Sequence, residues 1–191
     1  MSRETSLLGR ALLGLLLEGP LSGYDIRRIF TRTPMGSFSD SPGAIYPALE
    51  RLETAGLIRG RIESSAGLRQ RKTFQITPAG KESLKRWLSA PVSRDDVVHG
   101  TDELMLRFGF MDAGLGEAAS VRFLNGLQHE LKAYIPELKL YLEEHGREMP
   151  RSGCLALESG IRSYETLLHW TVHALAAYAK HADHSKGRKR S

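Results

Sequence analysis

Cysteine is almost missing from this chain of 191 residues, since Cys154 is the only one. One cysteine forms no disulfide within its own chain, which excludes a disulfide scaffold and predicts a reducing compartment, the cytoplasm. Long apolar runs are missing too. The run at residues 11–17 follows Arg10 and stops at Glu18-Gly19-Pro20, far short of the roughly 20 apolar residues of a membrane span. No small-residue cleavage site follows it, so we expect a buried helix and neither a signal peptide nor a membrane partner.

Charge of both signs is present but unevenly spread. Residues 1–90 hold 14 Lys and Arg against 8 Asp and Glu, a net charge of +6. Residues 91–182 hold 9 against 13, and the tail 183–191 holds 4 against 1. A basic front half before an acidic back half indicates that a polyanion meets the front half.

The front half begins with the patterns of three helices. Thr5 or Ser6 can cap a helix over residues 6–18, whose leucines surround it and therefore need cover on more than one side. Ser22 stands three residues before Asp25, a variant of the capping box, which predicts a helix over residues 22–32. Residues 33–40 read as a loop, and Ser41-Pro42 starts a third helix that ends at Gly56.

The hydrophobic period then changes from helical to two. Residues 58–63 and 71–76 alternate as strands on either side of a turn at Gly67, and a further helix is expected over residues 78–90. Helix, helix, helix and hairpin in this order make a winged helix-turn-helix. We therefore predict a mainly α fold with a small two-stranded β wing. Tyr24 and Phe30 are assigned to its core.

In such a domain the third helix can enter the major groove of duplex DNA, and a basic hairpin suits phosphates. The side of the third helix opposite Ile45, Leu49 and Leu52 is small and lightly charged, whereas the hairpin carries five cations against one acid. We assign binding strength to the wing and register to the third helix. The candidate DNA-binding residues are Ser41, Gly43, Ala44, Tyr46, Pro47, Arg51, Arg61, Arg69, Arg71 and Lys72.

Three separated motifs carry a family resemblance. The segments LLLEGPLSGYDI (15–26), GAIYPALERLETAGLI (43–58) and KTFQITPAG (72–80) resemble the PadR family of transcriptional regulators. The resemblance covers residues 6–90 and implies a dimeric repressor, often of stress or detoxification genes, with Tyr46 as the recognition-helix tyrosine. It also implies a helical C-terminal dimerisation domain of the longer type. Residues 31–40 match no strong family signature.

The back half has the pattern of a helical dimerisation domain. Residues 90–96 read as a linker, and helices are expected over residues 102–112, 116–145 and 155–182. The expected domains are thus a winged helix-turn-helix at 1–90, a dimerisation domain at 91–182 and a basic flexible tail at 183–191. The apolar residues assigned to a homodimer interface are Leu8, Leu12, Leu124, Leu131, Ile135, Leu138, Ile161, Leu168, Val172 and Leu175.

We also weighed functions other than DNA binding by a homodimer. Trp170, Tyr164 and Trp87 are candidates for a small-molecule effector pocket. His169 and His173 share a helix face, but zinc needs three or four ligands, so no metal or other cofactor is expected. Gly80-Lys81 lacks the rest of a phosphate loop, and no enzyme is expected. The remaining alternative is a protein-interaction adaptor whose winged helix does not bind DNA.

Overall fold

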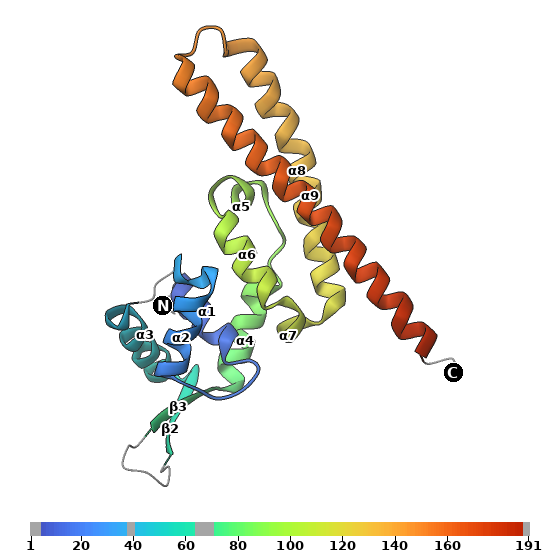
Figure 1. The fold of residues 1–191 in the computed structure, drawn as a ribbon. Helices are drawn as coiled ribbons and strands as arrows, with labels where there is room; N and C mark the ends of the chain where they lie inside the picture. Colours follow the sequence, from blue (N-terminus) through green and yellow to red (C-terminus); the bar gives the residue numbers. More distant parts are fainter. Residues whose placement is uncertain (1–4, 38–40, 64–70, 189–191) are drawn as a thin grey trace. The chain divides into compact units, whose positions relative to one another are not determined.

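The computed structural model describes residues 5–37, 41–63 and 71–188 (Figure 1). These residues fall into two compact units. The first unit holds the described residues up to 90 together with residues 105–116, and the second holds residues 91–104 and the described residues from 117 onward. The chain therefore crosses between the units three times, after residues 90, 104 and 116, and residues 105–116 group with the N-terminal part.

Short polar caps start the helices of the first unit. Ser6 caps α1 (Leu7–Leu15), and Ser22 caps α2 (Gly23–Arg32) in a capping box with Asp25. Ser41 caps α3 (Pro42–Thr54), and Thr77 caps α4 (Pro78–Leu88). Each cap oxygen accepts a backbone N–H that the helix leaves unpaired. A 3₁₀ turn, η1 (Pro34–Ser37), follows α2, while α6 (Thr101–Gly109) enters this unit and α7 (Met111–Leu115) packs on α4.

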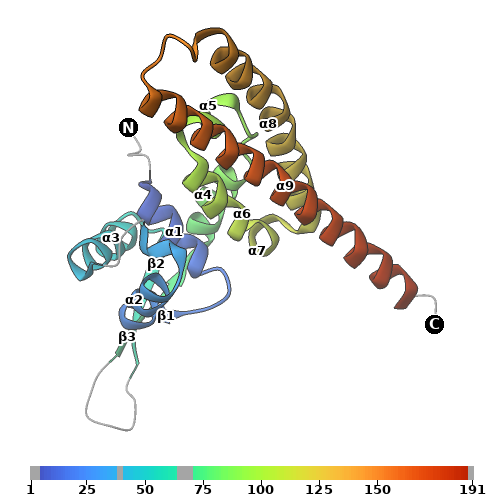
Figure 2. The same ribbon diagram turned by 45° about the horizontal axis from the view of Figure 1, so that its top comes forward.

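The sheet of the first unit has three strands where the sequence predicted two. In β2 (Ile58–Glu63) and β3 (Arg71–Ile76), Ile58 lies opposite Ile76 and Arg61 opposite Thr73. The extra strand is β1 (Leu21–Ser22), which pairs with the other edge of β3. Figure 2 shows β2 and β3 extending from the helices as a hairpin. The mainly α, winged-helix fold class is confirmed, with this correction: two residues are too few to show a strand's alternation in the sequence.

The wing is joined to α3 and α4 at one crowded point. Gly56, at φ 71°, ends α3 in the left-handed region, as its place in the sequence predicted. The hydroxyl of Thr77 donates to the carbonyls of Gly56 and Leu57, at 2.7 and 3.0 Å. A Cβ on Gly80 would lie 2.0 Å from the carbonyl oxygen of Leu57. Only glycine allows this approach of α4 to the start of β2.

The core of the first unit comes from every helix. Residues with little or no exposed surface include Leu12 and Leu13 of α1, Ile26 and Phe30 of α2, Ile45 and Leu49 of α3, and Leu84 and Leu88 of α4. Phe30 is thus buried as predicted, but Tyr24 is 65% exposed and the prediction for it was wrong. Tyr24 lies two residues before Ile26, about 200° around the helix, and so faces away from the core.

The second unit is built on two long helices. The helices α8 (Glu117–His145) and α9 (Arg151–Arg188) lie side by side as an antiparallel pair (Figures 1 and 2). Lys139 and Glu165 form an ion pair at 2.5 Å between them, and His181 lies 3.1 Å from Glu117. The helix α5 (Arg94–His99) packs on α8.

Two segments differ from the sequence prediction. Residues 94–96, expected in a linker, begin α5, because Ser93 caps it in a capping box with Asp96. This is the pattern that the sequence analysis used for Ser22 and Asp25. The helix α9 continues to Arg188, through residues that were assigned to a flexible tail. Residues 189–191 lie outside the described residues.

Candidate nucleic-acid interface

The helix α3 buries one side and exposes the side that the sequence analysis assigned to DNA. Ile45, Ala48, Leu49 and Leu52 are buried. The residues on the opposite side are mostly small or polar, apart from Tyr46, which is 44% exposed. Exposed there are Ser41, Gly43, Tyr46, Pro47 and Arg51, while Ala44 is half-buried.

Tyr46 does not stand free of the fold. A Cβ on Gly23 would lie 2.5 Å from Cε1 of Tyr46 and 3.2 Å from its hydroxyl oxygen. The phenol ring therefore lies against the backbone at the start of α2, in space that a side chain at position 23 would fill. The fixed position of this ring restricts where its hydroxyl group can donate a hydrogen bond.

The two faces of the wing carry different cations. Neighbouring side chains of a strand point to opposite faces, and residues opposite each other in a ladder share a face. The pairing of Arg61 with Thr73, and of Thr73 with Ser22, places Arg59, Arg61 and Arg71 on one face. Lys72 lies on the other face, opposite exposed Ile62. Arg69 lies outside the described residues.

Arg71 is bound by acid and hydroxyl groups of the first unit. Its guanidinium forms an ion pair with Asp25, and the same nitrogen donates to the Ser22 hydroxyl at 2.9 Å. Asp25 also accepts the Ser22 backbone N–H at 3.2 Å and the Ser22 hydroxyl at 2.7 Å. The side chain of Arg71 nevertheless stays 52% exposed. The contact joins β3 to the start of α2.

Lys72 is bound in a similar way on the other face. Its ammonium nitrogen lies 2.7 Å from Oε2 of Glu53, near the end of α3. The other carboxylate oxygen of Glu53 accepts the backbone N–H of Gly60 at 2.9 Å. A Cβ on Gly60 would meet the Lys72 side chain at 2.2 Å and Glu53 at 2.6 Å. Glycine at this strand position makes room for the ion pair.

Both carboxylates are held in their charged form. Burial raises the pKa of Asp25, but hydrogen bonds from Ser22 and Arg71 outweigh it, and the pKa lies below its ordinary value. For Glu53, the hydrogen bonds from Lys72 and from the Gly60 N–H lower the pKa against a smaller effect of burial. By contrast, no ion pair to Arg51, Arg59 or Arg61 occurs among the residues that the structure describes.

The three candidates for an effector pocket divide between the units. Trp87 belongs to the first unit, where the guanidinium of Arg10 lies 5.4 Å from its ring centre. Tyr164 and Trp170 belong to the second, where the rings of Tyr164 and Tyr134 meet edge to face at 5.3 Å. Burial raises the pKa of the Tyr164 hydroxyl, with a smaller contribution from Tyr134.

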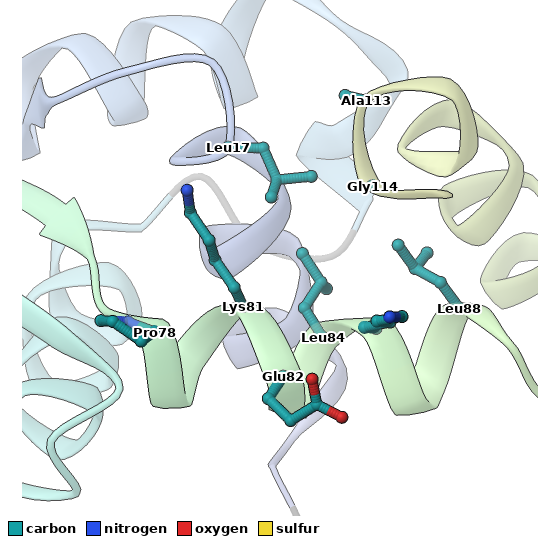
Figure 3. A pocket seen from close by; sticks show the side chains of 9 residues that line it. Leu17, Pro78, Lys81, Glu82, Leu84, Leu88, Ala113 and Gly114 are labelled. Atoms are coloured by element: carbon teal, nitrogen blue, oxygen red, sulfur yellow. The ribbon is translucent and has the colours of Figure 1, made fainter. Parts of the chain in front are cut away.

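A hollow of about 360 Å³ lies in the first unit beside α4 (Figure 3). Leu17, Leu84 and Leu88 are its apolar lining residues, and Gly114 of α7 also lines it. Lys81 extends beside Leu17, whereas Glu82 points away on the other side of α4. None of the three effector-pocket candidates lines it.

The apolar residues assigned to a homodimer interface differ in exposure. Half-buried are Leu8, Leu138, Leu168 and Leu175, and Val172 is 49% exposed. Apolar side chains that the sequence analysis did not select are also exposed: Leu140, Tyr141 and Leu155, near the α8–α9 turn. The remaining candidates, buried within a single chain, are Leu12, Leu124, Leu131, Ile135 and Ile161.

Metal-binding clusters and membrane-spanning helices are both absent from the described part of the chain. Within residues 5–37, 41–63 and 71–188, no group of three or more His, Cys, Asp or Glu side chains is placed to hold a metal ion. Over the same residues, no helix combines the length and the apolar character needed to cross a membrane.

Known proteins resemble the chain in sequence and in structure. A negative transcriptional regulator, PadR of Bacillus subtilis, is 35% identical over 123 residues, covering 64% of this chain and 66% of that protein. A probable transcriptional regulator of Mycobacterium tuberculosis is 29% identical over 86 residues, 45% of this chain and 46% of that one. The chain thus spans about two thirds of one relative's length and half of the other's.

Two solved structures were compared as well. Bacillus subtilis PadR in complex with operator DNA is 26% identical, covering 91% of this chain and 99% of that one, with a TM-score of 0.42. A PadR-like regulator of Bacillus cereus is 28% identical at 90% and 98% coverage, with a TM-score of 0.38. Residues 12–86 match the family described as the transcriptional regulator PadR-like family. Through this domain, the chain belongs to the PadR-like transcriptional regulators, a family of regulators rather than enzymes.

Proposed function

We propose that the chain regulates transcription by binding duplex DNA, with α3 in the major groove and the wing beside it on phosphates. The observation that carries this proposal is that two surfaces of the first unit border the start of α2, where Tyr46 of α3 and Arg71 of β3 both make contact. One is the exposed side of α3 around Tyr46, and the other is the wing face with Arg59 and Arg61. The relative named a negative transcriptional regulator supports repression as the direction of control.

The proposed DNA-binding residues on α3 are those of the sequence analysis, and on the wing Arg61 is joined by Arg59 of β2. Arg59 shares a wing face with Arg61, and both are exposed. Arg51 extends from the exposed side of α3. Phosphate contacts fix position on the duplex, whereas contacts to base edges select the sequence. Tyr46 and Arg51 are thus the candidates for base contact.

The regulator is proposed to act as a homodimer on a pseudo-palindromic operator. Two copies related by a twofold axis present two α3 helices to half-sites about one helical turn apart. The second unit offers exposed apolar side chains for self-association, Val172 on α9 and Leu140, Tyr141 and Leu155 near the α8–α9 turn. The residues that are already buried in one chain, such as Leu124, stabilise the packing of α8 against α9 instead.

A small-molecule effector that releases the regulator from DNA is the last part of the proposal. Such a molecule must bind the DNA-competent and incompetent states with different affinity. The chain has two tryptophans, Trp87 in the first unit and Trp170 in the second, and both are effector-pocket candidates of the sequence analysis, as is Tyr164. Tryptophan fluorescence therefore tests the candidate pocket. A saturable change in emission as a small molecule is titrated into the protein supports it. The variants Trp87→Phe and Trp170→Phe show which tryptophan gives the change.

The DNA proposal is tested by titrating the full chain into fluorescent random-sequence duplex DNA at several salt concentrations. We expect the affinity to fall steeply with salt, and Arg61→Ala to flatten the log–log slope by about 0.9 for one lost phosphate contact. Arg162→Ala on α9, also an exposed arginine, is the matched control and should leave the slope unchanged. Absent or salt-independent binding would contradict the proposal.

The second candidate, a winged-helix adaptor that binds protein, is favoured by one observation. Arg71 and Lys72, two cations of the wing, are paired with acids of their own chain. Such pairing lowers the charge that the wing offers to a polyanion. The same titration separates the candidates, because an adaptor shows no salt-dependent affinity for duplex DNA.

A further inference from the structure

The wing carries two carboxylate contacts that the DNA-binding proposal does not use. Asp25 belongs to the first turn of α2, and Glu53 to the last turn of α3. Each is bonded to one cation of β3, Arg71 or Lys72. The two helices of the helix-turn-helix are therefore each tied to the same strand of the wing.

Each carboxylate also holds backbone, which makes the contact more than a surface ion pair. Asp25 accepts the Ser22 N–H, at the last residue of β1 and the cap of α2. Glu53 accepts the N–H of Gly60 in the middle of β2. Hydrogen bonds to a charged acceptor are the stronger kind. A carboxylate with several donors from two elements fixes the angle between those elements.

Arg71 and Arg61 are diagonal neighbours on one wing face, because Arg61 lies opposite Thr73 and Arg71 lies two residues before Thr73 on β3. Like charges at such a spacing repel each other. Asp25 neutralises Arg71 and so lowers that repulsion. Arg61 then lies beside a guanidinium that is already paired with Asp25.

We propose that Asp25 and Glu53 are positioning residues of the DNA interface, which hold the wing against α2 and α3 through Arg71 and Lys72 and leave Arg59 and Arg61 to contact phosphate. This inference rests on the proposed function. It assigns the cations of the wing to two roles. Removing a positioning carboxylate misplaces the wing and weakens DNA binding, although it makes the protein more positive.

The opposite sign is expected if the acids only compete with DNA for the cations. In that case, removing Asp25 releases Arg71 to a phosphate, which strengthens binding and steepens the salt slope by about 0.9. The direction of the change in affinity therefore separates the two roles. Net charge alone also predicts stronger binding for any lost acid, so a charge-matched control is needed.

The experiment compares the wild-type chain with Asp25→Asn, Glu53→Gln and the control Glu18→Gln on random-sequence duplex DNA over a range of salt. Glu18 is an exposed acid of the first unit, outside the wing. We expect Asp25→Asn to lose about 5- to 20-fold in affinity and Glu53→Gln about 3-fold, the size expected for lost charge-assisted hydrogen bonds. The control should bind as the wild type does or slightly better.

Two further measurements guard against a simple folding defect. Asp25→Glu keeps the charge and a capping box, so it should bind to within about 3-fold of wild type, whereas a defect caused by any substitution at this position would persist. Thermal unfolding shows whether each variant is folded at the binding temperature. If Asp25→Asn is not folded, the DNA affinity of Glu53→Gln tests the proposal instead. That variant should stay folded, because glutamine can still accept the Gly60 N–H.

Tighter binding by Asp25→Asn or Glu53→Gln, or binding equal to the control, overturns the positioning roles. Those outcomes leave the proposed function intact, because the wild-type chain still binds DNA with a salt dependence. Loss of salt-dependent binding in the wild type itself overturns the proposed function and this inference together. The two failures are thus told apart by the wild-type titration.

Discussion

The ring of Tyr46, on α3, rests on the backbone of Gly23, the first residue of α2. A Cβ at Gly23 would come within 2.5 Å of the ring, closer than two carbon atoms approach without one of them moving. The contact places an aromatic side chain of the proposed DNA-binding helix directly on the helix before it. The ring is partly exposed, so its position depends on this support.

We therefore predict that Gly23→Ala weakens DNA binding more than it weakens the fold. The new methyl group pushes the ring of Tyr46 away from α2, whereas the flexible side chain can yield and relieve most of the strain. The expected loss is about 5- to 10-fold in duplex affinity, about 1–1.4 kcal/mol of binding free energy. Fluorescence anisotropy measures it, with the thermal midpoint recorded alongside.

Gly109→Ala is the control for that change. A Cβ at Gly109 meets no atom within 4 Å, and alanine favours helix by up to about 1 kcal/mol over glycine. This variant should bind DNA as the wild type does and unfold no earlier. A Gly23→Ala protein with wild-type affinity would show that the Tyr46 position does not matter for binding.

Gly80→Ala tests the junction between the wing and α4. Its Cβ would lie 2.0 Å from the carbonyl oxygen of Leu57, a backbone atom that cannot rotate away. Overpacking of this kind costs about 1–3 kcal/mol and sometimes more, so we expect the free energy of unfolding to fall by about 3 kcal/mol. Denaturant unfolding followed by circular dichroism measures it, and wild-type stability would contradict the close approach.

Two substitutions in the second unit distinguish the buried core between α8 and α9 from the proposed dimer surface. Leu124 is fully buried on α8, so Leu124→Ala should cost about 2–5 kcal/mol of unfolding free energy. Val172 is half exposed on α9. The substitution Val172→Ser should leave the α8–α9 pair folded but weaken the dimer. Sedimentation equilibrium measures the dissociation constant, and an unchanged constant would remove Val172 from the interface.

The pKa shifts of Asp25 and Glu53 predict how stability depends on pH. Both pKa values lie below their ordinary values of 3.8 and 4.5 in the folded chain. Each carboxylate therefore binds protons more weakly in the folded than in the unfolded state, and its stabilising effect is present above the ordinary value and lost as the pH falls through the lower folded value.

The corresponding measurement compares wild type with the Asp25→Asn, Glu53→Gln double variant. We expect the wild type to have the higher thermal midpoint between about pH 5 and pH 7, above the ordinary carboxyl pKa values. The two midpoints should converge as the pH falls below about 4. A gap that stays constant down to pH 3 would show that these carboxylates titrate as they do in the unfolded chain.

Helix starts could be predicted from the sequence because their determinants are local. Ser22 with Asp25, Ser41 with Pro42, and Thr77 with Pro78 each mark the observed first turn, since a cap bonds a backbone group two or three residues away. The same rule applied to Ser93 and Asp96 would have predicted α5. Tyr24 was placed in the core although the spacing to Ile26 puts it on the opposite side.

The contacts of the wing could not be predicted in the same way. Arg71 lies 46 residues from Asp25, and Lys72 lies 19 residues from Glu53. Their pairing depends on the register of β3 against β1 and β2, which sets the face of each side chain. From the sequence alone, all five cations of the wing are assigned to phosphate, because no local pattern shows which acid faces which strand.

Ser22 finishes β1, caps α2 and accepts a hydrogen bond from Arg71, and this combination limits the permitted length of the connection between α1 and α2. A one-residue shift of β1 against β3 would turn the serine side chain to the other face of the sheet and separate all of these contacts at once. Insertions and deletions should therefore be tolerated at other places in the chain rather than within this pairing. A library of single-residue insertions, sorted for folded protein, should be depleted between Leu21 and Ser22, the two residues paired with β3.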